Sequence, residues 1–295
     1  MHVQGSPSRA VAPLCEHGLV AAREASLPIA VFDSGVGGLT VLHELLVSLP
    51  HEDFTYLGDT ARFPYGERTH AELEAYATEL GGRLVDQGAK LLVVACNSAT
   101  AAALPTLRAT LGREVPVVAV VEPDARLAAQ VTQNGQVGLL ATEATVASRA
   151  YDHALAQHAP DATLHSVACP ALAPLIQAGE EIDVRVLRLI EGYCDPLRRA
   201  GVDTVILGCT HYPLVRPMLQ RELGRGVMLV SSAEAVADAV ERELEAGGLS
   251  APPDRRGSYR FMCSGDPDEF RRVGTRFLQL PMEHVEHVDV AGVAA

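Results

Sequence analysis

Two cysteines stand at matching places in two similar segments of the chain, which makes them the first candidates for chemistry. Residues 91–98 read Leu-Leu-Val-Val-Ala-Cys-Asn-Ser, and residues 205–211 read Val-Ile-Leu-Gly-Cys-Thr-His. Each segment predicts an apolar strand that ends in a small residue, a cysteine and polar side chains. A single cysteine in such a place is usually a buried structural residue. The repetition favours a pair of thiols, Cys96 and Cys209, on the two walls of one cleft, because ligands bind at the carboxyl ends of parallel strands.

Two more side chains could move protons near these thiols. His211 lies two residues after Cys209 and could hold Cys209 as a thiolate or accept its proton, which would lower a thiol pKa that is ordinarily about 8.5. Asp33 follows the apolar segment 29–32 and could orient an amine or act as a base. Capping of a helix is an equally good interpretation of Asp33 from this segment alone.

A glycine-rich turn at residues 33–40, Asp-Ser-Gly-Val-Gly-Gly-Leu-Thr, follows the same strand. Its free backbone N–H groups and the helix that begins there predict a site for an anion. Thr40 occupies the place of the third glycine of the dinucleotide-binding fingerprint, and there is no lysine for a phosphate loop, so we expect a carboxylate. A second turn, residues 59–66, can offer Tyr65, Gly66 and backbone N–H groups to a substrate.

Other chemistries fit the sequence less well. Neither cysteine is followed by arginine at the sixth position, which disfavours a cysteine phosphatase loop. A zinc ion bound by Cys96, Cys209 and His211 matches the residue types but lacks the closely paired ligands of most zinc motifs. Lys90, the only lysine, precedes its strand at the edge away from the proposed cleft, which argues against a pyridoxal phosphate Schiff base. We therefore expect no metal and no cofactor.

The elements that must position these residues alternate between strands and helices from residue 28 onward. Apolar runs without polar alternation indicate strands covered on both faces, and their alternation with helices predicts an α/β fold. Strands are expected at Ile29–Phe32, Phe54–Gly58, Lys90–Ala95, Val115–Val121, Val137–Ala141, Thr163–Ala168, Thr204–Gly208, Val227–Val230 and Tyr259–Cys263. Helices are expected at Leu39–Ser48, Ala71–Gln87, Ala99–Thr110, Ala144–His158, Asp183–Ala200, Ala233–Ala246 and Asp266–Leu278.

The length of 295 residues favours two lobes, because a single core stops growing at about 250–300 residues. The candidate crossings are Glu122–Asp124 and Val230–Ala233. They predict a lobe A of residues 28–122 plus 231–295 and a lobe B of residues 123–230. Residues 1–27 are expected to be an N-terminal extension, either mobile or a regulatory arm.

Composition restricts the class of protein. The chain is 48% hydrophobic, has a formal net charge of −13 and contains no apolar run of about 18 residues. We therefore expect a soluble protein that binds neither nucleic acid nor membranes. Six cysteines without a Cys-x-x-Cys pair, and no recognisable signal peptide, favour the reducing cytoplasm.

Six blocks of the sequence together resemble the glutamate racemases of the cofactor-independent amino-acid racemase superfamily. The blocks are Val31–Thr40, Asp59–Gly66, Ala95–Asn97, Glu122–Pro123, Cys169–Pro170 and Leu207–Leu214. They occur in the order of that family and cover roughly residues 28–280. The resemblance implies two pseudo-symmetric α/β lobes, the second inserted in the first. Each would have a mostly parallel sheet flanked by helices, with the active site in the cleft between them.

The resemblance also implies a function, the interconversion of L- and D-glutamate without a cofactor, which would supply D-glutamate for peptidoglycan synthesis. It implies Cys96 and Cys209 as the acid and base on the two faces of the substrate, with Asp33 and His211 assisting them. A homodimer is expected from the resemblance only. The implied substrate contacts are Asp33, Ser34, Tyr65, Gly66, Asn97, Ser98, Thr210 and His211.

The sequence departs from this family at two places that bear on the site. Asp124 stands where the family often has glycine after Glu-Pro, so the crossing between the lobes is expected to bend differently. Gln177 stands where some members have a functional glutamate, and an amide cannot act as a base. Either Glu180 or Glu181 takes over that role, or the role is absent.

Two kinds of alternative function stay open at this point. Within the superfamily, an aspartate racemase is disfavoured by the block at residues 33–40, and a single-thiol decarboxylase by the presence of both cysteines. A two-lobed protein that binds an amino acid without converting it belongs to a different class. Such a binder has no reason to exchange the substrate α-hydrogen with solvent.

Overall fold

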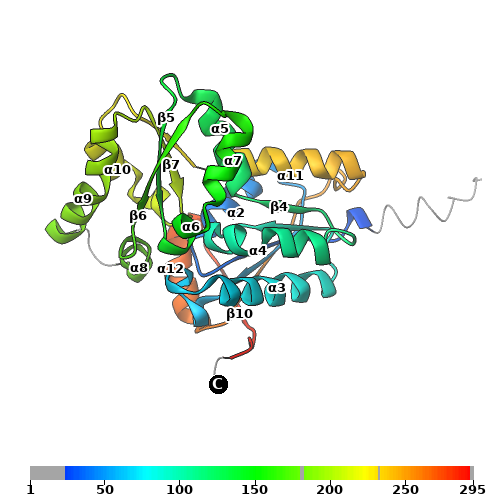
Figure 1. The fold of residues 1–295 in the computed structure, drawn as a ribbon. Coiled ribbons are helices and arrows are strands. Elements are labelled where there is room, and N and C mark those ends of the chain that lie inside the picture. Colours follow the sequence, from blue (N-terminus) through cyan, green and yellow to red (C-terminus); the bar gives the residue numbers. More distant parts are fainter. Residues whose placement is uncertain (1–23, 180–182, 232, 293–295) are drawn as a thin grey trace, which may run out of the picture.

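The strands form two separate sheets in the structure, a computed structural model that describes residues 24–179, 183–231 and 233–292. The first sheet contains β1 (Ile29–Asp33), β2 (Phe54–Gly58), β3 (Leu91–Val94), β4 (Val117–Ala119), β9 (Tyr259–Cys263) and β10 (Glu286–His287). The second contains β5 (Gln136–Ala141), β6 (Thr163–Ala168), β7 (Thr204–Gly208) and β8 (Met228–Val230). Their orders are β10-β9-β2-β1-β3-β4 and β6-β5-β7-β8, with parallel pairing throughout both sheets. The expected α/β fold with two parallel sheets is confirmed (Figure 1).

Helices cover these sheets and connect successive strands (Figure 1). They are α2 (Leu39–Ser48), α3 (His70–Asp86), α4 (Asn97–Thr110), α5 (Val121–Val131), α6 (Glu143–Ser148), α7 (Ala150–His158), α8 (Leu172–Ala178), α9 (Val184–Ala200), α10 (Arg216–Leu223), α11 (Ala233–Gly247) and α12 (Pro267–Leu278). Short 3-10 turns lie at Thr60–Arg62, Tyr65–Glu67 and Tyr212–Val215. In the part of the chain that the structure describes, no helix combines the length and apolar character needed to cross a membrane.

The central strand β1 shows why apolar runs without alternation become strands here. All five of its residues are buried. Successive side chains of a strand point to opposite faces, so Ile29 and Val31 enter one hydrophobic cluster, and Ala30 and Phe32 enter the other. A strand covered by helices on both faces has no polar face to show, as parallel sheets require.

The expected strand at Val115–Val121 is too long at its carboxyl end. The strand β4 ends at Ala119, and α5 begins at Val121. The reason is local, because Glu122 and Asp124 are acidic residues in the first helical turn, where the helix dipole favours them. Pro123 is tolerated in that turn because its missing N–H would have no partner within the helix.

The expected helix at Ala144–His158 is two helices, α6 and α7. Arg149, between them, has a φ of 56°, a left-handed conformation that breaks the helical path. Thr142 caps α6 by accepting a hydrogen bond from the backbone N–H of Thr145. Helices α8 and α10 were missed because their seven and eight residues are too few for a helical period to stand out.

The second sheet is built from a continuous part of the chain between strands of the first. After β8, helix α11 packs against α2, and β9, α12 and β10 complete the first sheet. The proposed crossing at Glu122–Asp124 falls in the first turn of α5, and the crossing after Val230 falls directly after β8. The division into lobes at residues 122/123 and 230/231 stays a prediction.

Lys90 holds three separate segments together at the amino edge of the first sheet. Its side chain is buried and its Nζ donates to Glu52 Oε2 at 2.5 Å, to Ala25 O at 2.7 Å and to Leu249 O at 2.8 Å. These bonds use all three donors of an ammonium group. The other carboxylate oxygen of Glu52 accepts from the backbone N–H of Ala251 at 2.7 Å. The only lysine therefore lies at the edge opposite the strand ends that carry the thiols.

We expect Lys90→Met to lower the free energy of unfolding by about 3–5 kcal/mol, because it leaves the buried Glu52 carboxylate without its cation. Urea denaturation measures this loss. The double variant Lys90→Met/Glu52→Gln should recover part of it, since the amide oxygen still accepts from Ala251 N–H. Arg271→Met breaks an exposed ion pair and should change stability by less than about 1 kcal/mol. A Lys90→Met loss as small as that of Arg271→Met would contradict the prediction.

Candidate active site

Three strand ends bring the predicted site residues together. Asp33 is the last residue of β1, Cys96 follows β3, and Cys209 follows β7. A cavity between these ends has about 440 Å³ of atom-free space, its mouth included. It is lined by Ser34, Phe63, Pro64, Tyr65, Gly66, Glu67, Cys96, Asn97, Ser98, Thr142, Pro170, Ala173, Pro174, Cys209, Thr210 and His211. Every predicted site residue lines it except Asp33, which is buried beneath the lining.

Cys96 occupies the N-cap of α4. Its backbone is extended, with φ −83° and ψ 122°, and its Sγ accepts from the backbone N–H of Ala99 at 3.5 Å. The thiol therefore sits at the positive end of a helix, which favours a thiolate. Burial opposes this and, together with the charge of Asp33, raises the pKa of Cys96 to about 12.

Cys209, from the second sheet, lies on the same cavity and contacts a histidine. Its Sγ is 3.7 Å from Nδ1 of His211, and Nε2 of His211 is 3.0 Å from Oε1 of Gln177. When Nε2–H donates to the amide oxygen, the lone pair of Nδ1 faces the thiol and can accept its proton. Burial raises the pKa of Cys209 well above its ordinary value.

His211 is enclosed by apolar groups from the first sheet's side of the molecule. Its ring centroid lies 5.6 Å from that of Phe63 and 5.3 Å from that of Phe277. This burial lowers the pKa of His211 to about 3, so the ring is neutral at neutral pH. The neutral ring can therefore accept a hydrogen bond from the Cys209 thiol, and it is not a standing positive charge in the resting protein.

The glycine-rich turn is shaped by what approaches it from the second sheet. A Cβ on Gly37 would lie 2.3 Å from Thr210 Oγ1 and 2.4 Å from His211 Nδ1. A Cβ on Gly35 would lie 2.6 Å from Gln177 Oε1. Real Cβ atoms do not come this close to other heavy atoms, so these glycines make room for the side chains that surround Cys209.

Asp33 is fully buried and bound from both sheets. Its Oδ1 accepts from the backbone N–H of Gly35 at 2.8 Å, and its Oδ2 accepts from Thr210 Oγ1 at 3.2 Å. Burial outweighs these bonds and raises its pKa to about 6. Its carboxylate also accepts from the backbone N–H of Gly38, the residue at the N-cap of α2, so Asp33 stabilises the turn and the start of this helix together.

The polar residues that start α4 are engaged with the second sheet's helices. Asn97 Nδ2 donates to the hydroxyl of Tyr151 at 2.7 Å. Ser98 Oγ lies 2.8 Å from Thr142 Oγ1 and 3.3 Å from Thr145 Oγ1. The predicted substrate contacts Asn97 and Ser98 thus also join the two halves of the cavity.

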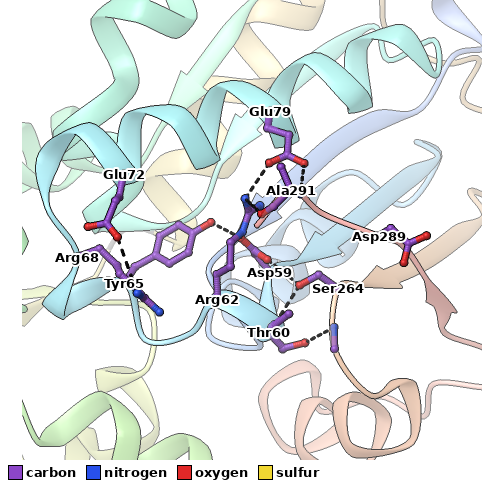
Figure 2. A network of polar contacts seen from close by, with 12 residues as sticks. Asp59, Thr60, Arg62, Tyr65, Arg68, Glu72, Glu79, Ser264, Asp289 and Ala291 are labelled. Carbon is purple, nitrogen blue, oxygen red and sulfur yellow. Dashed lines mark hydrogen bonds and ion pairs between the residues drawn. The ribbon is translucent and has the colours of Figure 1, made fainter. Parts of the chain in front are cut away.

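Tyr65 is held in place by a buried carboxylate. Its hydroxyl donates to Asp59 Oδ2 at 2.5 Å, and the same carboxylate accepts from Arg62 Nε at 2.6 Å and Ser264 Oγ at 2.6 Å (Figure 2). Arg62 Nη1 in turn donates to Glu79 at 2.7 Å. The Tyr65 hydroxyl is therefore committed to Asp59, and the remaining parts of the Tyr65–Gly66 turn are the groups available to a ligand.

Sequence reasoning missed several members of this site. Tyr151 was treated only as part of a helix, and Phe63 only as part of a turn, because nothing in their spacing marks them. Gln177, which departs from the family pattern, is the hydrogen-bond partner of His211. Glu180 and Glu181, the suggested substitutes, lie outside the described residues. Within those residues no three His, Cys, Asp or Glu side chains are grouped as a metal site would require.

Comparisons with known proteins agree with this geometry. Residues 42–240 match the family model described as Asp/Glu/Hydantoin racemase. A glutamate racemase from Beutenbergia cavernae is 47% identical over 276 residues, covering 90% of this chain and 94% of its own. The crystal structure of a glutamate racemase isoform from Bacillus anthracis superposes with a TM-score of 0.85 at 38% identity, covering 90% of this chain and 98% of that chain.

A third relative was solved with a ligand. The glutamate racemase from Francisella tularensis in complex with D-glutamate has a TM-score of 0.84 and 31% identity, with 90% of this chain and 98% of that chain covered. Sequence and fold thus point the same way over nearly the whole length of each protein. The chain belongs to the Asp/Glu/Hydantoin racemase family.

Proposed function

We propose that this protein is a glutamate racemase that interconverts L- and D-glutamate by proton transfer between two thiols. The observation that carries the proposal is that Cys96 and Cys209 come from different sheets and line one cavity. Inversion of a stereocentre by proton transfer needs a base on one face of the α-carbon and an acid on the other. The names of the relatives, and the D-glutamate bound to one of them, support glutamate as the substrate.

Proton transfer in this mechanism is balanced over the two thiols. The thiolate on one face removes the α-proton and becomes a thiol. The thiol on the other face gives its proton to the resulting carbanion and becomes a thiolate. The product therefore leaves the two cysteines with exchanged protonation states, ready for the reverse direction.

Asp33 and His211 are the groups that can prepare the thiolates. The thiol proton of Cys209 can pass to Nδ1 of His211, which is 3.7 Å away. On the other side, the carboxylate of Asp33, with a pKa of about 6, is the group that can take the proton of Cys96. Its negative charge raises the pKa of Cys96, and protonation of Asp33 removes this effect. A charge on Cys96 also raises the pKa of Cys209, so a single thiolate at a time is favoured.

The cavity is suited to a carbanion that no cofactor stabilises. Its walls are mostly buried groups with fixed hydrogen bonds, such as the pairs Ser98–Thr142 and Thr210–Asp33. Fixed donors in a site that excludes water interact strongly with developing charge. The supply of D-glutamate for peptidoglycan and a homodimer are further parts of the proposal, and both rest on the resemblance to the family. A cytoplasmic location is also part of it, and rests on the cysteine pattern and the absence of a recognisable signal peptide.

The deciding experiment follows the optical rotation of L- and D-glutamate with reduced, cofactor-free protein in heavy water, and α-deuterium by mass spectrometry. Convergence of both enantiomers on an equal mixture that carries deuterium is the expected result. If the optical rotation does not change and no deuterium is incorporated, with glutamate and also with aspartate, the result would favour a protein that binds an amino acid without converting it. Added chelator or pyridoxal phosphate should not change the rate.

Each catalytic thiol is expected to be indispensable. Cys96→Ser and Cys209→Ser should each lower the racemisation rate by about 10²–10⁴-fold, because a hydroxyl is a far weaker acid than a thiol. Cys194→Ala, on α9 and outside the cavity lining, is the matched control and should keep most of the activity. Full activity in either serine variant would exclude the two-thiol mechanism.

The activity should depend on pH through Asp33. We expect kcat/KM to fall as pH drops through about 6, because protonated Asp33 cannot accept a thiol proton and its pKa is raised to about 6. Glutamate itself titrates near 4.3 and does not produce this limb. Asp33→Asn should lose about 10²–10⁴-fold in rate and should lack the acid limb. Asp268→Asn, on the exposed side of α12, is the control and should keep the wild-type pH profile. If Asp33→Asn still shows the fall in kcat/KM near pH 6, the titration belongs to another group.

A further inference from the structure

A chain of two hydrogen bonds runs from the cavity into the second half of the molecule. Asn97 Nδ2 donates to the Tyr151 hydroxyl at 2.7 Å, and that hydroxyl donates to Asp124 Oδ2 at 2.7 Å. Asn97 is 3% exposed, and Tyr151 and Asp124 are fully buried. The three residues belong to α4, α7 and α5, so the chain joins a helix of the first sheet to two helices of the second.

The direction of both hydrogen bonds is set by Asp124. The Tyr151 hydroxyl donates to Asp124 Oδ2, so its single proton points to that carboxyl group. The hydroxyl can then only accept from Asn97, which forces the NH₂ group of the amide toward Tyr151. Burial and the charge of Asp124 raise the pKa of Tyr151 well above its ordinary value, so the hydroxyl keeps its proton.

The other end of the amide is left for a ligand. Asn97 lines the cavity, and its Oδ1 is buried with no hydrogen-bond partner among the described residues. Most buried side-chain polar atoms have at least one partner, so such an atom needs an explanation. The explanation we infer is that Oδ1 accepts a hydrogen bond from a donor group of the ligand.

We propose that Asp124 and Tyr151 are positioning residues that hold the Asn97 amide with Oδ1 toward the cavity, where it accepts a hydrogen bond from the α-ammonium group of the substrate. The inference rests on the proposed function, since it takes an α-amino acid as the ligand. Asn97 follows Cys96 directly in the chain, so a hydrogen bond from the ammonium group to Asn97 also orients the attached α-carbon toward a thiol. A neutral amide oxygen accepts from the ammonium without removing its proton, which keeps the positive charge that makes the α-hydrogen acidic.

This arrangement gives a role to Asp124, which stands where the family often has glycine. Glycine at this position has no side chain to receive the Tyr151 hydroxyl. With aspartate, the orientation of a cavity amide is fixed from a helix on the other half of the molecule. Asn97 therefore has the orientation needed to bind the ammonium group only when the two halves are in the arrangement seen here.

The test compares glutamate with 2-hydroxyglutarate, which has a hydroxyl in place of the ammonium group. Tyr151→Phe leaves the NH₂ group without an acceptor, so the amide turns this group toward the cavity, where it opposes an ammonium donor. We expect the KM for glutamate to rise about tenfold. The competitive inhibition constant of 2-hydroxyglutarate should change less than threefold, because a hydroxyl can donate to the oxygen or accept from the nitrogen.

A second variant tests the origin of the direction. Asp124→Asn nearly preserves the shape of the side chain, but an amide can donate to the Tyr151 hydroxyl as well as accept from it. Both orientations of Asn97 then become populated, and the KM for glutamate should rise by an amount between those of wild type and Tyr151→Phe. Tyr259→Phe, partly exposed on β9, is the control and should change neither constant. Thermal melts of each variant report whether the fold is kept.

The outcomes separate this inference from the proposed function. If wild type racemises glutamate and both variants weaken glutamate more than 2-hydroxyglutarate, the inference is supported. If both ligands weaken by the same factor, or neither does, Asp124 and Tyr151 only support the fold and the inference is wrong while the function stands. If wild type neither converts nor binds glutamate, the proposed function is wrong and the inference is rejected with it.

Discussion

Burial of two thiols on one cavity is the constraint on which the rest of this structure depends. Desolvation raises the pKa of Cys96 to about 12 and that of Cys209 well above its ordinary value. A buried thiol can become a base only if a proton acceptor and compensating positive charge lie beside it. The fold supplies the first of these by ending β1 at Asp33 and by placing His211 just after Cys209. In the proposed mechanism these two groups are the proton acceptors, one for each thiol.

The close approach of the two sheets' edges explains residues that have no direct part in chemistry. Gly37 is needed because Thr210 and His211 occupy the space where its side chain would be, and a side chain at Gly35 would displace the amide of Gln177 from its place beside His211. The glycine-rich turn was expected to be an anion site from its pattern, and its crowded side shows a steric requirement as well. The N–H groups of Gly35 and Gly38 bind the Asp33 carboxylate, so the predicted anion site is left with the other N–H groups of the turn.

Prediction from sequence was most reliable where one residue type and one local pattern sufficed. The repeated strand-cysteine segments placed Cys96 and Cys209 on one cavity, and apolar runs located the strands β1 to β9, while the two sheets were expected from the resemblance to the family. The sequence could not reveal the Asn97–Tyr151–Asp124 chain, because its members are separated by more than twenty residues and a tyrosine in a helix usually only fills the core. Helix α5 (Val121–Val131) was not predicted, and the predicted strand Val115–Val121 ran into its first residue because the apolar run continues from strand into helix without a polar break.

The amide of Gln177 affects the conditions under which Cys209 becomes a thiolate. A carboxylate in its place would stabilise a positively charged His211 and, with it, a standing thiolate on Cys209. The neutral amide fixes the same ring nitrogen by a 3.0 Å bond, yet His211 keeps a pKa of about 3. In the proposed mechanism the missing positive charge then comes from the ammonium group of the substrate, which is attached to the α-carbon that lies between the two thiols. In this mechanism the thiolate base forms when the substrate is present, and the resting cysteines stay as thiols, the form that resists oxidation and alkylation.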